Sequence, residues 1–296
     1  MTNIKTLLVI GSTGQLGQSI KSIAIDYPNY DFIFSNRLQL DLGNEKSITD
    51  FFQNKPYDVI INCAAHTAVD KAESEAELAN QINHLAVQQL ANIAEQHSIK
   101  LIHISTDYVF NGKQHRPYLE TDEVEPQAVY GKTKLSGEQA IQKSQKTNAI
   151  IIRTGWVYSE YGNNFVKTML KLGSERESLN VIFDQVGTPT YAGDLAKAIM
   201  AVVQSDNFSQ TDFKTQIHHF SNEGVCSWYD FTKTIFELTN TQCQVSPIET
   251  KNYPTPATRP HYSVLNKAKI KQTYNLTIPY WKDSLQQCLT TLKEDE

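Results

Sequence analysis

A tyrosine and a lysine four residues apart, Tyr130 and Lys134 in the stretch VYGKTK, are the residues whose types and spacing best suit chemistry. On a helix, residues at this spacing lie on one face, so the ammonium and the phenol come close together. A nearby cation favours the ionised form of a phenol, and we therefore expect Lys134 to lower the pKa of Tyr130. Tyr130 then acts as a general acid toward a substrate oxygen.

Two hydroxyl residues, Ser105 and Thr106, lie at the end of the predicted strand LIHIS and extend this set. We expect the Thr106 hydroxyl to polarise a substrate carbonyl. Tyr130 then protonates the carbonyl oxygen, and a nicotinamide supplies a hydride to the carbonyl carbon. A Tyr and Lys pair at helical spacing also occurs on exposed helices, so the pair counts only together with a dinucleotide site. For Asn83, a polar residue on a helix face is the favoured interpretation, and holding Lys134 through water is the alternative.

Such a site is indicated by Gly11, Gly14 and Gly17 in the stretch IGSTGQLGQSI. These glycines follow an apolar run and open a helical pattern, where a tight turn must let backbone N–H groups approach a pyrophosphate. The positive end of the helix dipole then faces the phosphates. Because the motif sits directly after an N-terminal strand, it predicts dinucleotide binding.

The elements that must position these residues alternate between strands and helices. Apolar runs predict strands at residues 6–10, 31–34, 58–62, 100–105 and 149–153, and a helical pattern covers residues 75–96. This alternation predicts an α/β fold, a Rossmann-type doubly wound parallel sheet. After Trp156 the pattern changes to a helix near residues 164–172, a strand near 179–183 and a Pro-rich segment at 253–260, so we expect a smaller C-terminal substrate-binding lobe.

Composition excludes several classes of protein. The 296 residues carry a net charge of −5, so no overall basic excess favours nucleic acid or an anionic membrane surface. The four cysteines are scattered without a CxxC pair, which is typical of a reducing compartment. No apolar run approaches the roughly twenty residues of a membrane span, and the N-terminus does not resemble a signal peptide. We therefore expect a cytoplasmic protein.

The end of the second predicted strand bears on the choice of cofactor. NAD-binding proteins place an acidic residue there, whereas this chain has Ser35, Asn36 and Arg37. With no carboxylate to repel a 2′-phosphate and Arg37 to pair with one, NADPH is favoured, with NADH as the alternative. A solvated loop residue remains the other interpretation of Arg37. Small side chains at Ala64 and Ala65 leave room for a cofactor, although close packing by alanine explains them equally well.

Several longer strings carry a resemblance to a known family. They are AAHTAVDKAE, STDYVF, VYGKTKLSGE, RTGWVY, GNNFVKTML and YPTPATRP, which extend over most of the chain. Together with the GxxGxxG spacing, they resemble the extended short-chain dehydrogenase/reductase superfamily and, within it, the dTDP-4-dehydrorhamnose reductase family. This resemblance implies that residues 1–155 form the NAD(P)-binding domain and that residues 156–296 form the lobe that binds a sugar nucleotide. A strand and a helix from about residues 180–205 are expected to pack in the NAD(P)-binding domain.

The resemblance also implies roles for individual residues. It matches Thr106, Tyr130 and Lys134 to a catalytic set. The residues implied to contact the cofactor are Gly11, Gly14, Gln15, Leu16, Gly17, Asn36, Arg37, Asp41, Leu42, Ala64, Ala65, His66, Thr67, Tyr130 and Lys134. Those implied to contact the sugar nucleotide are Thr106, Asp107, Trp156, Asn164 and Arg259. A core tryptophan and a surface arginine are the alternative interpretations of Trp156 and Arg259.

The implied reaction is NADPH-dependent reduction of the C4 keto group of dTDP-4-dehydro-6-deoxy-L-mannose to dTDP-L-rhamnose. Related dehydratases carry Thr-Asp-Glu where this chain has Thr106, Asp107 and Tyr108, so the carboxyl group that eliminates water is absent. The alternatives are another nucleotide-sugar 4-ketoreductase or epimerase, and a regulatory subunit that binds NADP without turnover. The intact catalytic set argues against the regulatory subunit.

One departure from the family concerns metal. Some members bridge a homodimer through Mg²⁺ held by glutamates, and the matching positions here hold Ser19 and Gly193. Without these carboxylate oxygens a hard cation lacks ligands. We therefore expect no Mg²⁺, and either a monomer or a homodimer that assembles without metal.

Overall fold

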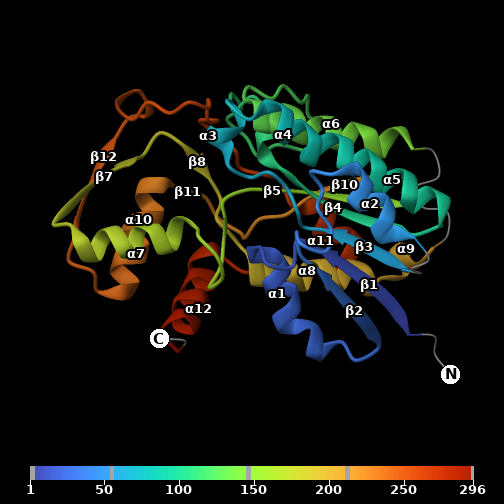
Figure 1. The fold of residues 1–296 in the computed structure, drawn as a ribbon. Coiled ribbons are helices and arrows are strands. Elements are labelled where there is room, and N and C mark those ends of the chain that lie inside the picture. The colour runs from blue at the N-terminus through green and yellow to red at the C-terminus, as the bar shows by residue number, and fades with distance from the viewer. Residues whose placement is uncertain (1–3, 54–56, 145–147, 211–213, 295–296) are drawn as a thin grey trace.

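Six parallel strands form the central sheet of the computed structural model, which describes residues 4–53, 57–144, 148–210 and 214–294 (Figure 1). Their order across the sheet is β10-β5-β4-β3-β1-β2. The bounds are β1 (Lys5–Ile10), β2 (Tyr30–Ser35), β3 (Val59–Asn62), β4 (Lys100–Thr106), β5 (Ala149–Thr154) and β10 (Gln216–His219). The predicted fold class is confirmed, because β1 pairs in parallel with β2 on one side and β3 on the other.

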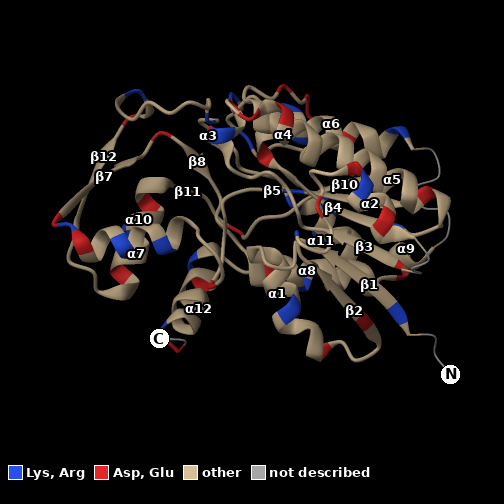
Figure 2. Ribbon diagram, in the orientation of Figure 1, with Lys and Arg blue, Asp and Glu red and all other residues tan. Residues whose placement is uncertain are grey.

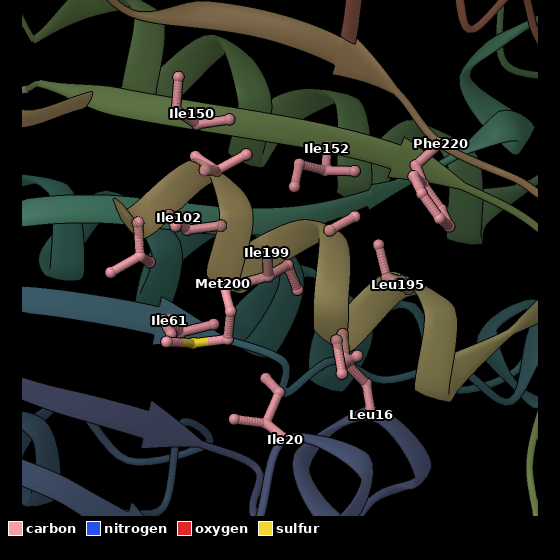
Figure 3. Packing of buried hydrophobic residues seen from close by; sticks show 14 of the residues in the cluster. Leu16, Ile20, Ile61, Ile102, Ile150, Ile152, Leu195, Ile199, Met200 and Phe220 are labelled. Carbon is pink, nitrogen blue, oxygen red and sulfur yellow. The ribbon is translucent and has the colours of Figure 1, made fainter. Parts of the chain in front are cut away.

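Helices cover both faces of this sheet because side chains alternate along each strand. Leu7 and Val9 of β1 face one layer, and Leu8 and Ile10 face the other. The first layer is α1 (Gln15–Ile23), α8 (Ala192–Gln204) and α11 (Ala268–Tyr274), and the second is α2 (Glu45–Phe52), α5 (Ala86–Gln96) and α6 (Val129–Lys143). Figure 3 shows Ile20 of α1 and Met200 of α8 meeting beneath Ile61 of β3.

The helix predicted over residues 75–96 is present as three continuous pieces. These are α4 (Ala76–Asn80), the π-helical turn η2 (Gln81–Leu85) and α5. The π turn lies against α6 where Gly137 has no side chain, and a Cβ there would collide with the Asn83 carbonyl oxygen. A short connecting helix, α3 (Val69–Ala72), precedes this group.

The smaller lobe has its own core and a two-stranded parallel sheet. The sheet pairs β7 (Ser178–Ile182) with β12 (Gln244–Ile248). Around it lie α7 (Phe165–Glu175), α10 (Trp228–Thr239) and α12 (Trp281–Glu294), which contribute to one buried cluster. Two further strand pairs are short, namely β6 (Val157–Tyr158) with β9 (Thr190–Tyr191) and β8 (Val186–Gly187) with β11 (Cys226–Ser227). The remaining elements are α9 (Asp206–Ser209), η1 (Ala24–Asp26), η3 (Asp107–Val109) and η4 (Thr250–Asn252).

The second half of the chain returns to the central sheet, but partly through other elements than the sequence suggests. Helix α8 packs beside α1, within the range expected to return. The strand near residue 180 does not return, because β7 buries only alternate residues, Leu179 and Val181, and so pairs with β12. The returning strand is β10, which escaped prediction because its sequence, QIHH, has no apolar run.

Figure 2 shows Lys and Arg interspersed with Asp and Glu along the ribbon of both lobes. Within the described ranges, no helix combines the length and the hydropathy that a membrane crossing needs.

Candidate active site

A cleft of about 700 Å³ opens at the carboxyl ends of the central strands. It lies where β1 leads to β2 on one side and β3 lies on the other, which is where ligands bind in open α/β sheets. The predicted site residues that line it are Gly11, Gly14, Gln15, Leu16, Arg37, Asp41, Leu42, Ala64, Ala65, Thr67, Thr106, Asp107, Tyr130, Lys134, Trp156 and Asn164. Gly17, Asn36, His66 and Arg259 lie outside this lining.

The glycine loop forms one wall of the cleft. Gly11 has a φ of +83°, and a Cβ there would come within 2.9 Å of the Ala64 nitrogen, so the loop packs closely on β3. A Cβ at Gly17 would collide with the carbonyl oxygen of Gly11. Helix α1 begins after Gly14, which has no side chain to cap the helix. The first backbone amides of α1 are therefore free to donate hydrogen bonds to a ligand. This wall fits a dinucleotide pyrophosphate.

The wall after β2 carries one cation beside one carboxylate. Arg37 lies 3.4 Å from Asp41, measured from Nε to Oδ1, and its side chain is 73% exposed. The sequence predicted that no carboxylate would lie near a 2′-phosphate at this strand end. That prediction holds for residues 35–37 only, because the turn brings the Asp41 carboxylate beside Arg37. Asn36 stabilises this turn, since its Oδ1 accepts hydrogen bonds from the Leu38 and Gln39 amides.

The segment after β3 is held from behind by Asn83. Its side chain accepts a hydrogen bond from the His66 amide (2.9 Å) and donates to the His66 carbonyl oxygen (3.2 Å) and to Thr133 (3.2 Å). The His66 ring points away from the cleft, with Nε2 2.8 Å from Glu75. Asn83 therefore fixes the backbone between Ala65 and Thr67, which both line the cleft.

Tyr130 and Thr106 meet at the inner end of the cleft. Burial raises the pKa of Tyr130 to about 12, although a hydrogen bond with Thr106 lowers it, and the charge of Asp107 raises it further. The prediction that Lys134 lowers this pKa is wrong, because its Nζ is turned toward Ile104 and His103 of β4. The phenol is thus protonated at neutral pH, as a general acid requires.

Lys134 is only 1% exposed and lies against β4. Its Nζ donates to the carbonyl oxygen of Ile104 (2.6 Å) and lies 3.3 Å from Nε2 of His103. Burial lowers the pKa of Lys134 to about 8, while the charge of Glu138 raises it. The side chain therefore titrates near neutral pH.

Thr106 caps the short helix that follows β4. Its Oγ1 donates to Asp107 Oδ1 (3.0 Å) and accepts from the Tyr108 amide (3.2 Å). Burial raises the pKa of Asp107 to about 6, while hydrogen bonds from Ser263 and Thr106 lower it. The contact orients the Thr106 hydroxyl beside Tyr130.

A buried ion pair ties α6 to the sheet behind these residues. Arg153 of β5 donates to both oxygens of Glu138 on α6, from Nε to Oε1 (3.0 Å) and from Nη2 to Oε2 (2.7 Å). Ser105 donates to the same carboxylate. Because Tyr130 and Lys134 are also on α6, this pair sets their position relative to β4.

The outer end of the cleft is shared by the two lobes. Trp156 adopts a φ of +53° and stacks on Trp228 of α10, with ring centroids 3.4 Å apart and planes 7° apart. An adjoining cavity of about 510 Å³ is lined by both rings and by Arg259. Arg259 forms a two-pronged ion pair with Asp70 of α3, at 2.6 and 3.0 Å.

Two predicted residues support the loops of the outer end through their side chains. Asn164 caps α7 by accepting from the Lys167 amide (3.2 Å) and donates to the Ser159 carbonyl oxygen (2.7 Å). Gln15 accepts from the Ser159 hydroxyl (3.1 Å), which links the glycine loop to the smaller lobe.

Several cleft residues were not identified from the sequence as site residues. Thr13, Cys63, Tyr108, Thr154 and Asn163 line the cleft. Each lies inside or beside a motif already recognised, and that position was the signal that could have found it. Burial raises the pKa of the Cys63 thiol to about 12, so Cys63 serves as a wall rather than a nucleophile.

Comparison with known proteins assigns the chain to a family. The family model described as RmlD substrate binding domain matches residues 5–294. A dTDP-4-dehydrorhamnose reductase of Aggregatibacter actinomycetemcomitans is 39% identical, with 95% of this chain and 97% of that protein aligned. The chain belongs to the dTDP-4-dehydrorhamnose reductase family. The resemblance of its motifs is thereby confirmed.

Solved structures of dTDP-4-dehydrorhamnose reductases have the same fold. One from Clostridium acetobutylicum is 40% identical with a TM-score of 0.90, covering 97% of this chain and 99% of that one. Another, from Bacillus anthracis and in complex with NADP, is 35% identical with a TM-score of 0.90, covering 98% of this chain and all of that one.

The positions matched to metal ligands in some dTDP-4-dehydrorhamnose reductases offer no oxygen anion here. Ser19 is buried and donates to the Gln15 carbonyl oxygen (3.0 Å). A Cβ at Gly193 would lie 2.6 Å from the Tyr191 ring. No cluster of three or more His, Cys, Asp or Glu side chains suited to a metal occurs among the residues that the structure describes.

Proposed function

We propose that this protein reduces the C4 keto group of dTDP-4-dehydro-6-deoxy-L-mannose with NADPH and releases dTDP-L-rhamnose, the last step of dTDP-rhamnose biosynthesis for surface polysaccharide. The observation that carries the proposal is the meeting of Tyr130 and Thr106 at the inner end of a dinucleotide-shaped cleft, in a chain of this family. The free cysteines suit a cytoplasmic enzyme.

The walls of the cleft fit the cofactor. The open amides of α1 receive the pyrophosphate, Arg37 receives the 2′-phosphate, and Ala64 and Ala65 leave room beside β3. When bound, NADPH supplies the hydride that reduces C4. These local donors act against a net charge of −5, which otherwise repels polyanionic ligands.

The protein's own residues supply the proton that the C4 oxygen receives. The Thr106 hydroxyl exchanges its hydrogen bond to Asp107 for one to the C4 carbonyl oxygen and so polarises that carbonyl. Tyr130, protonated at neutral pH, donates its proton to the same oxygen as the negative charge develops.

The outer end of the cleft suits the sugar nucleotide. We assign the residues up to about 155 to the cofactor and the lobe from residue 156 onward to the substrate. Trp156 presents an apolar face to the 6-deoxy sugar, Asp107 accepts from a sugar hydroxyl, and Arg259 meets the diphosphate. Arg259 must then exchange its contact with Asp70 for the phosphates.

The test mixes the protein with NADPH and enzymatically made dTDP-4-dehydro-6-deoxy-L-mannose and follows loss of nicotinamide absorbance. Stoichiometric oxidation with formation of dTDP-L-rhamnose is the expected result. An epimerase would change the sugar without net oxidation of NADPH. A regulatory subunit would bind NADPH and leave the sugar unchanged, and either outcome would refute the proposal.

Arg37 is expected to govern the preference between cofactors. R37A should raise KM for NADPH roughly tenfold and leave KM for NADH unchanged, because one charge-assisted contact with the 2′-phosphate is lost. D41N removes the competing carboxylate and should lower KM for NADPH. K46A, which removes an exposed cation paired with Asp50, is the matched control and should change neither value. An equal effect of R37A on both cofactors would contradict the assignment.

Removal of divalent metal is expected to leave the enzyme unchanged. Dialysis against EDTA should alter neither kcat nor the mass in solution, because Ser19 and Gly193 provide no carboxylate for a bridging cation. Activity is measured by NADPH oxidation and mass by light scattering. A fall in either that Mg²⁺ restores would show a metal-dependent assembly.

A further inference from the structure

A chain of buried polar groups runs beneath Lys134 and is not used by the proposed reaction. Asn62 and His103 are register partners on β3 and β4, and both are fully buried. Asn62 Nδ2 lies 3.1 Å from His103 Nδ1, and His103 Nε2 lies 3.3 Å from Lys134 Nζ. The three side chains therefore form a continuous path from the sheet to the catalytic helix.

The direction of the hydrogen bonds in this chain follows from one backbone group. The Ala64 amide can only donate, and it donates to Asn62 Oδ1 at 3.1 Å. That contact fixes the Asn62 amide with its NH₂ group toward His103, so Nδ1 of His103 accepts. The neutral imidazole then carries its proton on Nε2, directed at Lys134.

We propose that His103 is a positioning residue that donates its Nε2–H to Lys134 and so stabilises the neutral amine form of that side chain. A neutral amine can accept this hydrogen bond while still donating to the Ile104 carbonyl oxygen. An ammonium has no lone pair, so it would place one buried donor against another. Reversing the tautomer only moves the conflict to Asn62, whose NH₂ would then face an N–H.

The consequence concerns the proton that Tyr130 regains after each turnover, so this inference rests on the proposed function. Because the amine form is stabilised, the ammonium form of Lys134 gives up a proton to the Tyr130 phenolate more readily and becomes the amine. The amine takes up a proton from water in the open cleft before the next turnover. Burial, followed by the charge of Lys134, holds the pKa of His103 well below its usual range, so the ring stays neutral. The lowered pKa of Lys134 is consistent with the same arrangement.

Other titratable groups surround Lys134, and their charges are accounted for. Glu138, one turn further along α6, raises the pKa of Lys134 but is itself paired with Arg153. The π turn packed on α6 carries the neutral amide of Asn83 and the imidazole of His84, which bonds to Asn80. Burial, followed by the charge of Lys143, lowers the pKa of His84. The titratable groups of α6, β4 and η3 nearest to Lys134 are Tyr130, Glu138, His103, Asp107 and Tyr108.

The first test measures the His103 tautomer in the free protein, independently of turnover. In protein labelled with ¹⁵N-histidine, the His103 ring nitrogens are assigned by their loss in H103Q from the spectrum of the eight histidines. At pH 9 we expect a protonated Nε2 and an unprotonated Nδ1, with both shifts changing as Lys134 titrates near pH 8. A proton on Nδ1 would overturn the proposal, whether or not the protein reduces the sugar nucleotide.

The second test uses two amide variants that fill the ring position. H103N reaches only as far as Nδ1, so it keeps the contact with Asn62 and loses the donor to Lys134. H103Q reaches the position of Nε2 and keeps that donor. The alkaline limb of the kcat/KM profile for NADPH should move up by about one pH unit in H103N and return toward wild type in H103Q.

A matched control removes another fully buried imidazole from the same sheet. H218Q alters β10, which is separated from β4 by β5, and should leave the alkaline limb where it is in wild type. An unmoved limb in H103N, or an equal movement in H103N and H103Q, would show that His103 acts only through packing and would overturn the proposal.

Discussion

Y130F is expected to lower kcat by roughly a thousandfold while NADPH binds as tightly as in wild type. General acid catalysis by a positioned side chain contributes about 10²- to 10⁴-fold, and the substitution removes only the acidic proton. The Tyr130 phenol lines the cleft beside Thr106, so its loss leaves the C4 oxygen without a positioned acid. Single-turnover NADPH oxidation measures the rate, and fluorescence titration measures cofactor affinity.

The matched control for Y130F is Y57F. Tyr57 is another phenol of the first lobe, remote from the cleft lining and buried. Its hydroxyl has no hydrogen-bond partner among the described residues, so its loss should leave kcat unchanged. Retention of more than about a tenth of wild-type kcat in Y130F would exclude Tyr130 as the main acid.

R153M is expected to destabilise the protein by roughly 3–5 kcal/mol, the usual cost of leaving a buried charge without its partner. The Glu138 side chain is fully buried, and Arg153 provides its two-pronged partner. Ser105 alone then remains to bind the carboxylate. Urea unfolding followed by tryptophan fluorescence measures the change in the free energy of unfolding.

Two further variants separate charge from packing in this test. E138Q/R153M removes both charges and should recover much of the lost stability, because no buried ion is left unpaired. R116M breaks the half-exposed pair of Arg116 with Asp122 and should cost at most about 1 kcal/mol. Equal losses in R153M and R116M would mean that the buried pair contributes no more than a surface pair.

The elements nearest the N-terminus were predictable because their signals are local. The glycine loop, the apolar runs and the spacing of Tyr130 and Lys134 are each patterns of only a few consecutive residues. Each pattern matches an element of the structure. Strand β10 was missed because its two histidines interrupt any apolar run, although both are buried between layers.

Electrostatic details of the site were less predictable than its composition. A lysine one turn after a tyrosine suggests a cation beside a phenol, yet Lys134 is turned to Ile104 and His103 of β4. Likewise, the region around Arg37 reads as free of acid until the turn brings Asp41 beside it. Spacing along a helix defines a shared face, but the rotamer depends on which strand lies opposite.

By itself, the sequence determined the fold class and the family, and it predicted the glycine loop for the cofactor and the catalytic side chains, because periodicity, glycine positions and motif order are properties of neighbouring residues. The tertiary structure alone decided what those side chains contact. The pairing of Arg259 with Asp70, of Arg153 with Glu138 and of Lys134 with His103 joins elements far apart in the chain. Such contacts depend on how layers pack across the sheet, and no local pattern encodes that packing.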